Sequence, residues 1–299
     1  MSVTLTRRGL LGLAATLTAS ATVLSACGTT TTSSSGDKLS VVASTIVWGS
    51  IAEAVGGDLV KVTSVVKSPD QDPHDYEATA QDKLTMSTAK VAVVNGGGYD
   101  AWATQLAGSA EKKPTLVDAF ALSGLAEGAN EHVFYDLALA VTVANKLAET
   151  FGQADTANAT TYTENAKVFA DQIAAITKRA KDWSATHPGT KVVSTESVAE
   201  YLLKDLSLDD VTPADYIRQS ESEAGPSVAV VEKTRQLIGT EAKVLVVNGQ
   251  TEDAISKSLV DRATATGSRV VKVYETFPEG VSDYVTFVGD AINALTAEK

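Results

Sequence analysis

The chain has 299 residues, of which 44% are hydrophobic and 21% are charged, as in a globular protein with one large domain or two lobes. Its net charge is −12, from 25 Lys and Arg against 37 Asp and Glu. No cluster of Lys and Arg runs through the body of the chain, so we expect no nucleic-acid partner.

The first 26 residues have the pattern of a signal peptide. Arg7 and Arg8 precede an apolar run that small and polar residues interrupt too often for a permanent membrane helix. The run ends in LSAC, which resembles the lipobox of bacterial lipoproteins, and cleavage there would leave Cys27 at the new N-terminus. Cys27 is the only cysteine, so a disulfide within the chain is impossible.

The polar segment GTTTTSSSGDK follows directly, so we expect a lipidated Cys27 and a flexible tether over 27–38. The alternative is an ordinary secretory signal with an incidental cysteine. Arg7 and Arg8 also leave twin-arginine export open beside the general secretory route.

From residue 39 the chain alternates buried-strand patterns with helical ones. We predict strands at 39–46, 60–66, 90–95 and 114–119, with helices at 47–57 and 81–89 and a glycine loop entering a helix over 95–110. Two helical stretches without a strand between them follow, at about 136–150 and 155–184, and the second contains neither proline nor glycine.

After residue 190 the alternation resumes, with strands predicted at 191–195, 214–220, 243–249 and 268–275 and helices at 196–205, 226–239, 252–266 and 279–298. Strands separated by helices imply parallel sheets with crossovers. We therefore predict an α/β fold with two lobes, 39–154 and 187–299, each a four-stranded mostly parallel sheet flanked by helices. One long rigid helix, 155–186, would join them.

Ligands in such folds bind beyond the carboxyl ends of the strands, and several candidate metal ligands lie there. His74 follows the second predicted strand, Glu196 the fifth and Glu275 the eighth, while His132 follows the fourth strand after a loop. Histidine and carboxylate are the usual ligands of Zn²⁺ and Mn²⁺. No local motif such as HExxH or paired CxxC is present, and by pattern alone a lone loop histidine is more often a surface residue than a metal ligand.

Four segments in this order, DPHDYEATAQD, NGGGYDAW, EHVFYD and STESVAEYL, resemble the solute-binding lipoproteins of zinc and manganese ABC transporters (solute-binding protein family 9). The resemblance covers essentially the whole mature chain, and DPHDYE is its most specific piece. It implies one metal ion held between the two lobes by four side chains and delivered to a cognate ABC permease.

By this resemblance His74 is the first metal ligand, His132 the second and Glu196 the third. The third position is histidine in many zinc-binding members and glutamate in many manganese-binding members. The fourth ligand is normally an aspartate, and this chain offers YETFPEG. We therefore select Glu275, with Asp253 and Asp283 as the alternatives.

The chain departs from the family pattern around the second ligand, where Glu131 stands for the usual proline and Phe134 for the usual tryptophan. His187, the remaining histidine, matches no motif, and we expect it to be a solvated turn residue.

Two imidazoles and two carboxylates make a mixed nitrogen and oxygen site that favours Mn²⁺, although Zn²⁺ is possible and would bind more tightly in absolute terms. Four protein ligands leave no open position for a reactive water, so we predict a binding protein and not an enzyme. We expect a monomer outside the cytoplasm, anchored to the membrane by lipid on Cys27. The alternatives are an extracytoplasmic metalloenzyme and a surface adhesin or scaffold with a structural metal.

Overall fold

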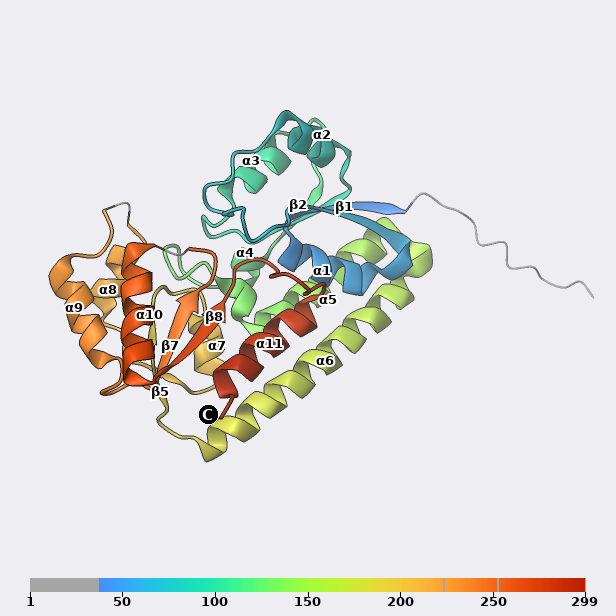
Figure 1. Ribbon diagram of the computed structural model, residues 1–299. Coiled ribbons are helices and arrows are strands. Elements are labelled where there is room, and N and C mark those ends of the chain that lie inside the picture. The colour runs from blue at the N-terminus through green and yellow to red at the C-terminus, as the bar shows by residue number, and fades with distance from the viewer. Residues whose placement is uncertain (1–37, 223, 252, 299) are drawn as a thin grey trace, which may run out of the picture. The chain divides into compact units, whose positions relative to one another are not determined.

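Two four-stranded parallel sheets organise the protein, whose computed structural model describes residues 38–222, 224–251 and 253–298 (Figure 1). The signal peptide and Cys27 lie outside the described residues. The first sheet has the order β2-β1-β3-β4 and the second the order β6-β5-β7-β8. Their strands are β1 (Leu39–Thr45), β2 (Val60–Val66), β3 (Val91–Val94), β4 (Thr115–Asp118), β5 (Lys191–Ser194), β6 (Asp209–Asp210), β7 (Val244–Asn248) and β8 (Arg269–Val273).

Helices connect nearly all of the strands, as parallel pairing requires. The helices of the first half are α1 (Ile46–Gly56), η1 (Gly57–Leu59), α2 (Ala80–Thr88), α3 (Ala101–Ser109), α4 (Ala119–Ser123), η2 (Val133–Tyr135) and α5 (Leu137–Ala154). Those that follow are η3 (Thr156–Asn158), α6 (Ala159–Thr186), α7 (Glu200–Asp205), α8 (Ala214–Ser220), α9 (Val228–Leu237), α10 (Ala254–Thr266) and α11 (Tyr284–Thr296). None of the helices among the described residues is long and apolar enough to cross a membrane.

The two sheets share one topology, so the loops that follow corresponding strands leave corresponding edges of the two sheets. In both sheets the strand order reverses beside the first strand of the set, between β1 and β3 and between β5 and β7. The central strands β3 and β7 are buried along their whole length, which explains their unbroken apolar sequences VAVV and VLVVN. Loops that carry polar side chains leave the carboxyl ends of these strands.

The long helix α6 packs along α5 and also contacts α1 and α11 (Figure 1). Its buried stripe includes Tyr162, Phe169 and Ile173, at the spacing of one helical face. These side chains belong to a hydrophobic cluster that also contains Val93 of β3 and Val246 of β7. One core therefore supports both sheets, and the lobe boundaries expected at 154 and 187 remain a prediction.

The predictions for two segments of the second half, 214–220 and 196–205, differ from the structure. The segment 214–220, predicted as a strand, is helix α8, and the outermost strand of the second sheet is β6, which contains only Asp209 and Asp210. The two-residue strand pairs with β5 through its backbone, so it has no hydrophobic pattern to detect. The helix predicted at 196–205 begins only at Glu200, which leaves Glu196 in a bend after β5.

Candidate metal centre

His74 lies on the loop between β2 and α2, and contacts with the start of α3 hold that loop. The indole Nε1 of Trp102 donates a hydrogen bond to the carbonyl oxygen of Pro73 at 3.0 Å. The ring of the buried Tyr99 meets the His74 imidazole edge-on, with ring centroids 4.6 Å apart. The glycine loop and α3 therefore place the first histidine, although they lie more than 20 residues along the chain.

His132 is buried at the start of η2, and a hydrogen bond with Asn130 determines the tautomer of its imidazole. Asn130 Nδ2 donates to the carbonyl oxygen of Ser197 and to Glu200 Oε2, both at 2.9 Å, so Asn130 Oδ1 is the atom that faces His132. His132 Nδ1 lies 2.8 Å from that oxygen. Because Asn130 Oδ1 can only accept, Nδ1 carries the proton and Nε2 keeps a free lone pair, the tautomer that a metal ligand needs.

Glu275 follows β8 and lies between the two histidines. Its Oε2 atom is 3.6 Å from His74 Nε2 and 3.7 Å from His132 Nε2. The residue is only 5% exposed, and within the described part of the chain this oxygen has no hydrogen-bond donor. Two ligand atoms at about 2.1 Å from one ion in tetrahedral geometry are about 3.4 Å apart. Each of the two measured distances therefore matches the spacing of two ligands of one cation.

The side-chain amide of Asn248 links Glu196 to this group by hydrogen bonds. Asn248 Nδ2, at the end of β7, donates to Glu196 Oε2 and to Glu275 Oε1, both at 2.7 Å. The other oxygen of Glu196 accepts a hydrogen bond from the Thr251 hydroxyl. One buried amide thus holds two carboxylates side by side, which like charges would otherwise oppose.

The closeness of these groups shifts the pKa values of Glu275, His74 and Glu196. Burial alone would raise the pKa of Glu275, but His132 and His74 together hold that pKa well below its usual range. For His74 burial is the largest single influence and lowers the pKa, but the carboxylates of Glu275, Asp72 and Glu131 together raise the net pKa above 6.5. Burial raises the pKa of Glu196 against hydrogen bonds from Thr251 and Asn248.

The site opens into an acidic cavity of about 510 Å³. Among the described residues its lining contains no Lys or Arg. Seven carboxylates line it: Asp72, Asp75, Glu131, Glu196, Glu221, Asp253 and Glu275. A cleft lined by one sign of charge raises the local concentration of the opposite ion, here a cation.

The alternatives for the fourth ligand have other roles in the structure. Asp253 caps α10, where its side chain accepts a hydrogen bond from the backbone N–H of Ser256, although it also lines the cavity. Asp283 caps α11 and lies in a different hollow, beside Ser50. Of the three candidates, only Glu275 approaches the histidines.

His187 lies outside the cavity. It follows α6 and stacks on Trp183, with ring centroids 4.4 Å apart, and its Nε2 is 3.7 Å from Glu298.

Sequence reasoning missed three contributors to the site: Asn130, Glu131 and Asn248. A signal for Asn248 was present, because an Asn-Gly pair follows the third strand of each run, at Asn95 and at Asn248. Asn95 Nδ2 donates to the Glu131 carbonyl oxygen at 2.9 Å, so each asparagine holds a segment that carries candidate ligands. Asn130 and Glu131 had no such signal, because their partners come from distant elements.

Comparisons with known proteins identify the family of the chain. The family of the zinc-uptake complex component A, described as periplasmic, matches residues 41–298. The chain is 30% identical over 258 residues to the metal ABC transporter substrate-binding lipoprotein ScbA of Streptococcus cristatus, covering 79% of this chain and 81% of ScbA. Identity and coverage are the same for the manganese ABC transporter substrate-binding lipoprotein scaA of Streptococcus gordonii.

A solved structure has the same fold. The SBP FpvC from Pseudomonas aeruginosa, in complex with Mn²⁺, matches with a TM-score of 0.73 and 22% identity, over 87% of this chain and 97% of FpvC. At this level of identity the likeness concerns the arrangement of the two sheets and their helices.

Proposed function

The chain belongs to the zinc-uptake complex component A family, the substrate-binding proteins of metal ABC transporters, and from that membership we propose that it captures Mn²⁺ or Zn²⁺ and delivers the ion to a permease. Members of this family are binding proteins and not enzymes. The proposed ligands are His74, His132, Glu196 and Glu275, and the protein acts as a monomer outside the cytoplasm.

The observation that carries this proposal is the convergence on Glu275 Oε2. Two imidazole nitrogens lie 3.6 and 3.7 Å from this buried oxygen, which no described group hydrogen-bonds. An orphaned buried carboxylate oxygen is costly, and a cation between the three atoms would remove that cost. The acidic cavity supports the same conclusion, because it would attract a cation and repel an anion.

Mn²⁺ is the ion that we propose as cargo. Glu196 and Glu275 supply hard oxygen donors, and two carboxylates that bind through both oxygens could raise the coordination number above four, which Mn²⁺ accepts. The relative scaA is named as a manganese transporter protein, which supports the same ion. Zn²⁺ would bind more tightly in a direct titration, as the Irving–Williams order requires, so affinity alone does not identify the cargo.

A titration of the metal-free protein with Mn²⁺ and with Zn²⁺ tests the site. We expect one ion per chain for the wild type and at least about tenfold weaker binding for His74→Ala and His132→Ala, since each removes a ligand. His187→Ala is the matched control, because His187 stacks on Trp183 outside the cavity and should leave binding unchanged. Wild-type affinity in both site variants would overturn the proposal. Elemental analysis of protein purified from its own host then identifies the cargo.

Cys27 is the proposed lipid anchor, on the sequence LSAC and the polar tether that follows it. Cys27→Ala should release the protein from the membrane fraction of the cell. A variant that stays membrane-bound, together with an unmodified Cys27 thiol in the intact protein by mass spectrometry, would refute the anchor.

A further inference from the structure

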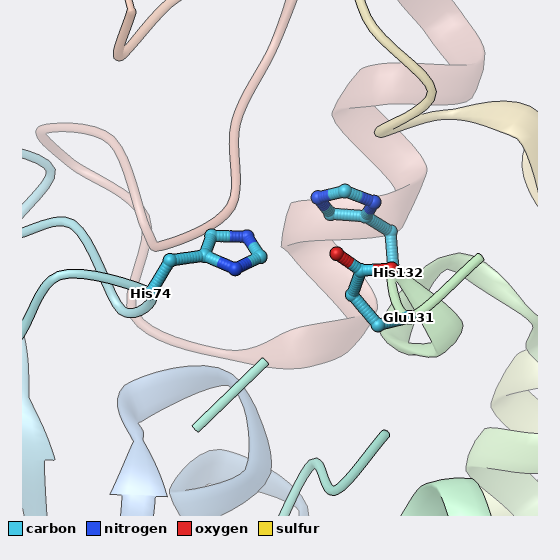
Figure 2. A group of neighbouring side chains, drawn as sticks. All are labelled: His74, Glu131 and His132. Carbon is cyan, nitrogen blue, oxygen red and sulfur yellow. The ribbon is translucent and has the colours of Figure 1, made fainter. Parts of the chain in front are cut away.

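Glu131 places a further carboxylate beside the two histidines, at a position that the four-ligand set does not include. One ligand atom each of His74, Glu131 and His132 lies within 4.8 Å of the others. Figure 2 shows the Glu131 carboxylate turned toward the space between the two imidazoles. The Glu131 side chain has no hydrogen-bond donor or ion-pair partner among residues 38–222, 224–251 and 253–298 and is therefore available to a ligand.

The backbone holds Glu131 in this position. Its carbonyl oxygen accepts the hydrogen bond from Asn95 Nδ2 at 2.9 Å, and the next residue, His132, is buried and bonded to Asn130. With the main chain held on both sides of its Cα, only the side-chain torsions of Glu131 remain to be ordered. A carboxylate positioned in this way loses little freedom when it binds an ion.

These three side chains all come from the part of the chain before α6. His74 leaves β2, and Glu131 and His132 precede α5. Glu196 and Glu275 come after α6, and Asn248 ties them to each other. The N-terminal half therefore presents two imidazoles and one carboxylate by itself, and such a set binds divalent transition metals and leaves other coordination positions open.

Exposure separates Glu131 from Glu275, although Glu196 is half-buried as Glu131 is. Glu131 is half-buried and the His74 side chain is 34% exposed, whereas the Glu275 side chain is 6% exposed. An ion that enters from the cavity meets the more exposed groups first. The family pattern usually has proline where this chain has Glu131. With proline there, the N-terminal half would offer two neutral imidazoles and no negative charge to offset that of the cation.

We propose that Glu131 is a metal ligand, and that His74, Glu131 and His132 form a capture site that receives the ion before the buried Glu275 binds it. This inference rests on the proposed function. In the transfer the bond from Glu131 to the metal breaks as a bond from Glu275 forms, and both histidines stay bound throughout. One carboxylate replaces another, so that no proton or electron moves.

The first experiment isolates the capture site. In a Glu196→Gln/Glu275→Gln background we expect Zn²⁺ to bind weakly, and addition of Glu131→Gln should lower this residual affinity at least about tenfold. Glu127→Gln, an exposed glutamate of the same loop outside the cavity, is the control and should leave the residual affinity unchanged. Absence of residual binding, or residual binding that Glu131→Gln does not alter, would overturn the inference.

The second experiment uses the otherwise wild-type protein, so it does not depend on the folding of a multiple variant. A ligand used only in transit changes the rates of association and dissociation together, so Glu131→Gln should slow both severalfold in stopped-flow measurements while Kd stays within about twofold. Asp75→Asn removes the same charge from the cavity and should slow association alone. A Glu131→Gln protein that behaves like Asp75→Asn, or like wild type, would show that Glu131 is not a ligand.

The outcomes separate this inference from the proposed function. If His74→Ala and His132→Ala weaken binding while Glu131→Gln changes neither rate, the proposed function stands and the capture site is wrong. If the histidine variants bind metal as the wild type does, both proposals fail.

Discussion

At the scale of single residues, the site is a set of charges that a cation or a proton can stabilise. Glu275 is almost fully buried, and two imidazole nitrogens lie within 4 Å of its Oε2 atom. A proton on His74 and a metal ion at the centre would both compensate this carboxylate. The proton and the metal ion therefore compete, so metal binding should weaken as pH falls.

The first prediction concerns pH and uses His74. Its pKa is raised in the folded protein, so the metal-free fold gains stability that is fully present below about pH 6.5 and is lost as pH rises through the raised value. In chelator, the difference in Tm between wild type and His74→Gln should therefore shrink from about pH 6 to about pH 8. Glu275 contributes in the same range, because its lowered pKa keeps it ionised and its contribution is lost only in more acidic solution.

Metal reverses this trend, because the ion needs unprotonated imidazoles. The metal-induced increase in Tm should grow from about pH 6 to about pH 8, and affinity should fall up to about tenfold per pH unit for each displaced proton as pH decreases. The same pH trend with and without metal would remove His74 from the site.

The second prediction concerns Glu196, whose pKa burial raises. Glu196→Gln removes a charge that the folded protein desolvates, so Tm in chelator should not fall. The metal-induced increase in Tm should become smaller for both ions, and more so for Mn²⁺, which depends more on hard oxygen donors. A tenfold loss of affinity would reduce the stabilisation by saturating metal by about 1.4 kcal/mol.

Melting curves of wild type and Glu196→Gln, with chelator and with each ion, measure these effects, and Glu127→Gln is the control. A role of Glu196 as an ordinary helix-capping residue is already contradicted, because α7 begins at Glu200. An unchanged metal-induced shift would remove Glu196 from the ligand set and would weaken the case for manganese.

At the scale of secondary structure elements, the loop before η2 is joined to the segment between β5 and α7. Three hydrogen bonds join Asn130 to the segment that leads into α7: the Tyr201 hydroxyl donates to the Asn130 carbonyl oxygen at 2.7 Å, and the Asn130 side-chain amide donates to Ser197 and Glu200. The second half of the chain thus orients a histidine of the first half. Partners of this kind commonly tune a metal site as strongly as a ligand does.

The third prediction follows from this link. Asn130→Ala should weaken metal binding by about 10–100-fold, because His132 loses the partner that fixes its tautomer. It should also destabilise the metal-free protein by about 1–3 kcal/mol, because the buried Nδ1–H of His132 loses its acceptor. Tyr201→Phe removes only one hydrogen bond and should cost about 1 kcal/mol, with a much smaller change in affinity. Titration calorimetry and denaturant unfolding measure both, and equal losses of affinity in the two variants would contradict a role through His132.

At the scale of the whole molecule, the acidic balance of the chain is concentrated where it can act on a cation. The net charge is −12, and seven carboxylates line the cavity that leads to the histidines. Because the described lining contains no Lys or Arg, the field inside the cavity has one sign. Such a field mainly accelerates association and changes dissociation little.

The fourth prediction is a salt dependence of capture. The association rate should fall at least about tenfold as the Debye length shortens from about 30 Å at 0.01 M salt to about 3 Å at 1 M. The variant Asp75→Asn/Glu221→Gln should show a slower rate at low salt and a shallower dependence on salt. Asp58→Asn/Asp290→Asn removes two exposed charges outside the cavity and is the control. A rate independent of salt in the wild type would contradict electrostatic steering.

The amino-acid sequence by itself determined the α/β class and most strand positions. Segments such as VAVV and VLVVN are short apolar runs rich in β-branched valine, a composition typical of parallel strands that are buried on both faces. The sequence also separated His74 and His132 from His187, because only the first two lie in family motifs. The strand β6 escaped detection because its two residues are aspartates and carry no hydrophobic pattern.

Only the tertiary structure decided which acidic residues approach the histidines. Sequence analysis selected Glu275 but left Asp253 and Asp283 open as alternatives, since a carboxylate near a strand end can bind a ligand or cap a helix. Folding makes Asp253 and Asp283 helix caps and brings Glu275 within 4 Å of both imidazoles. Asn248 and Glu131 come to lie beside these groups for the same reason. A metal site gathered from distant segments depends on distances in space, and neither periodicity nor spacing along the chain encodes these distances.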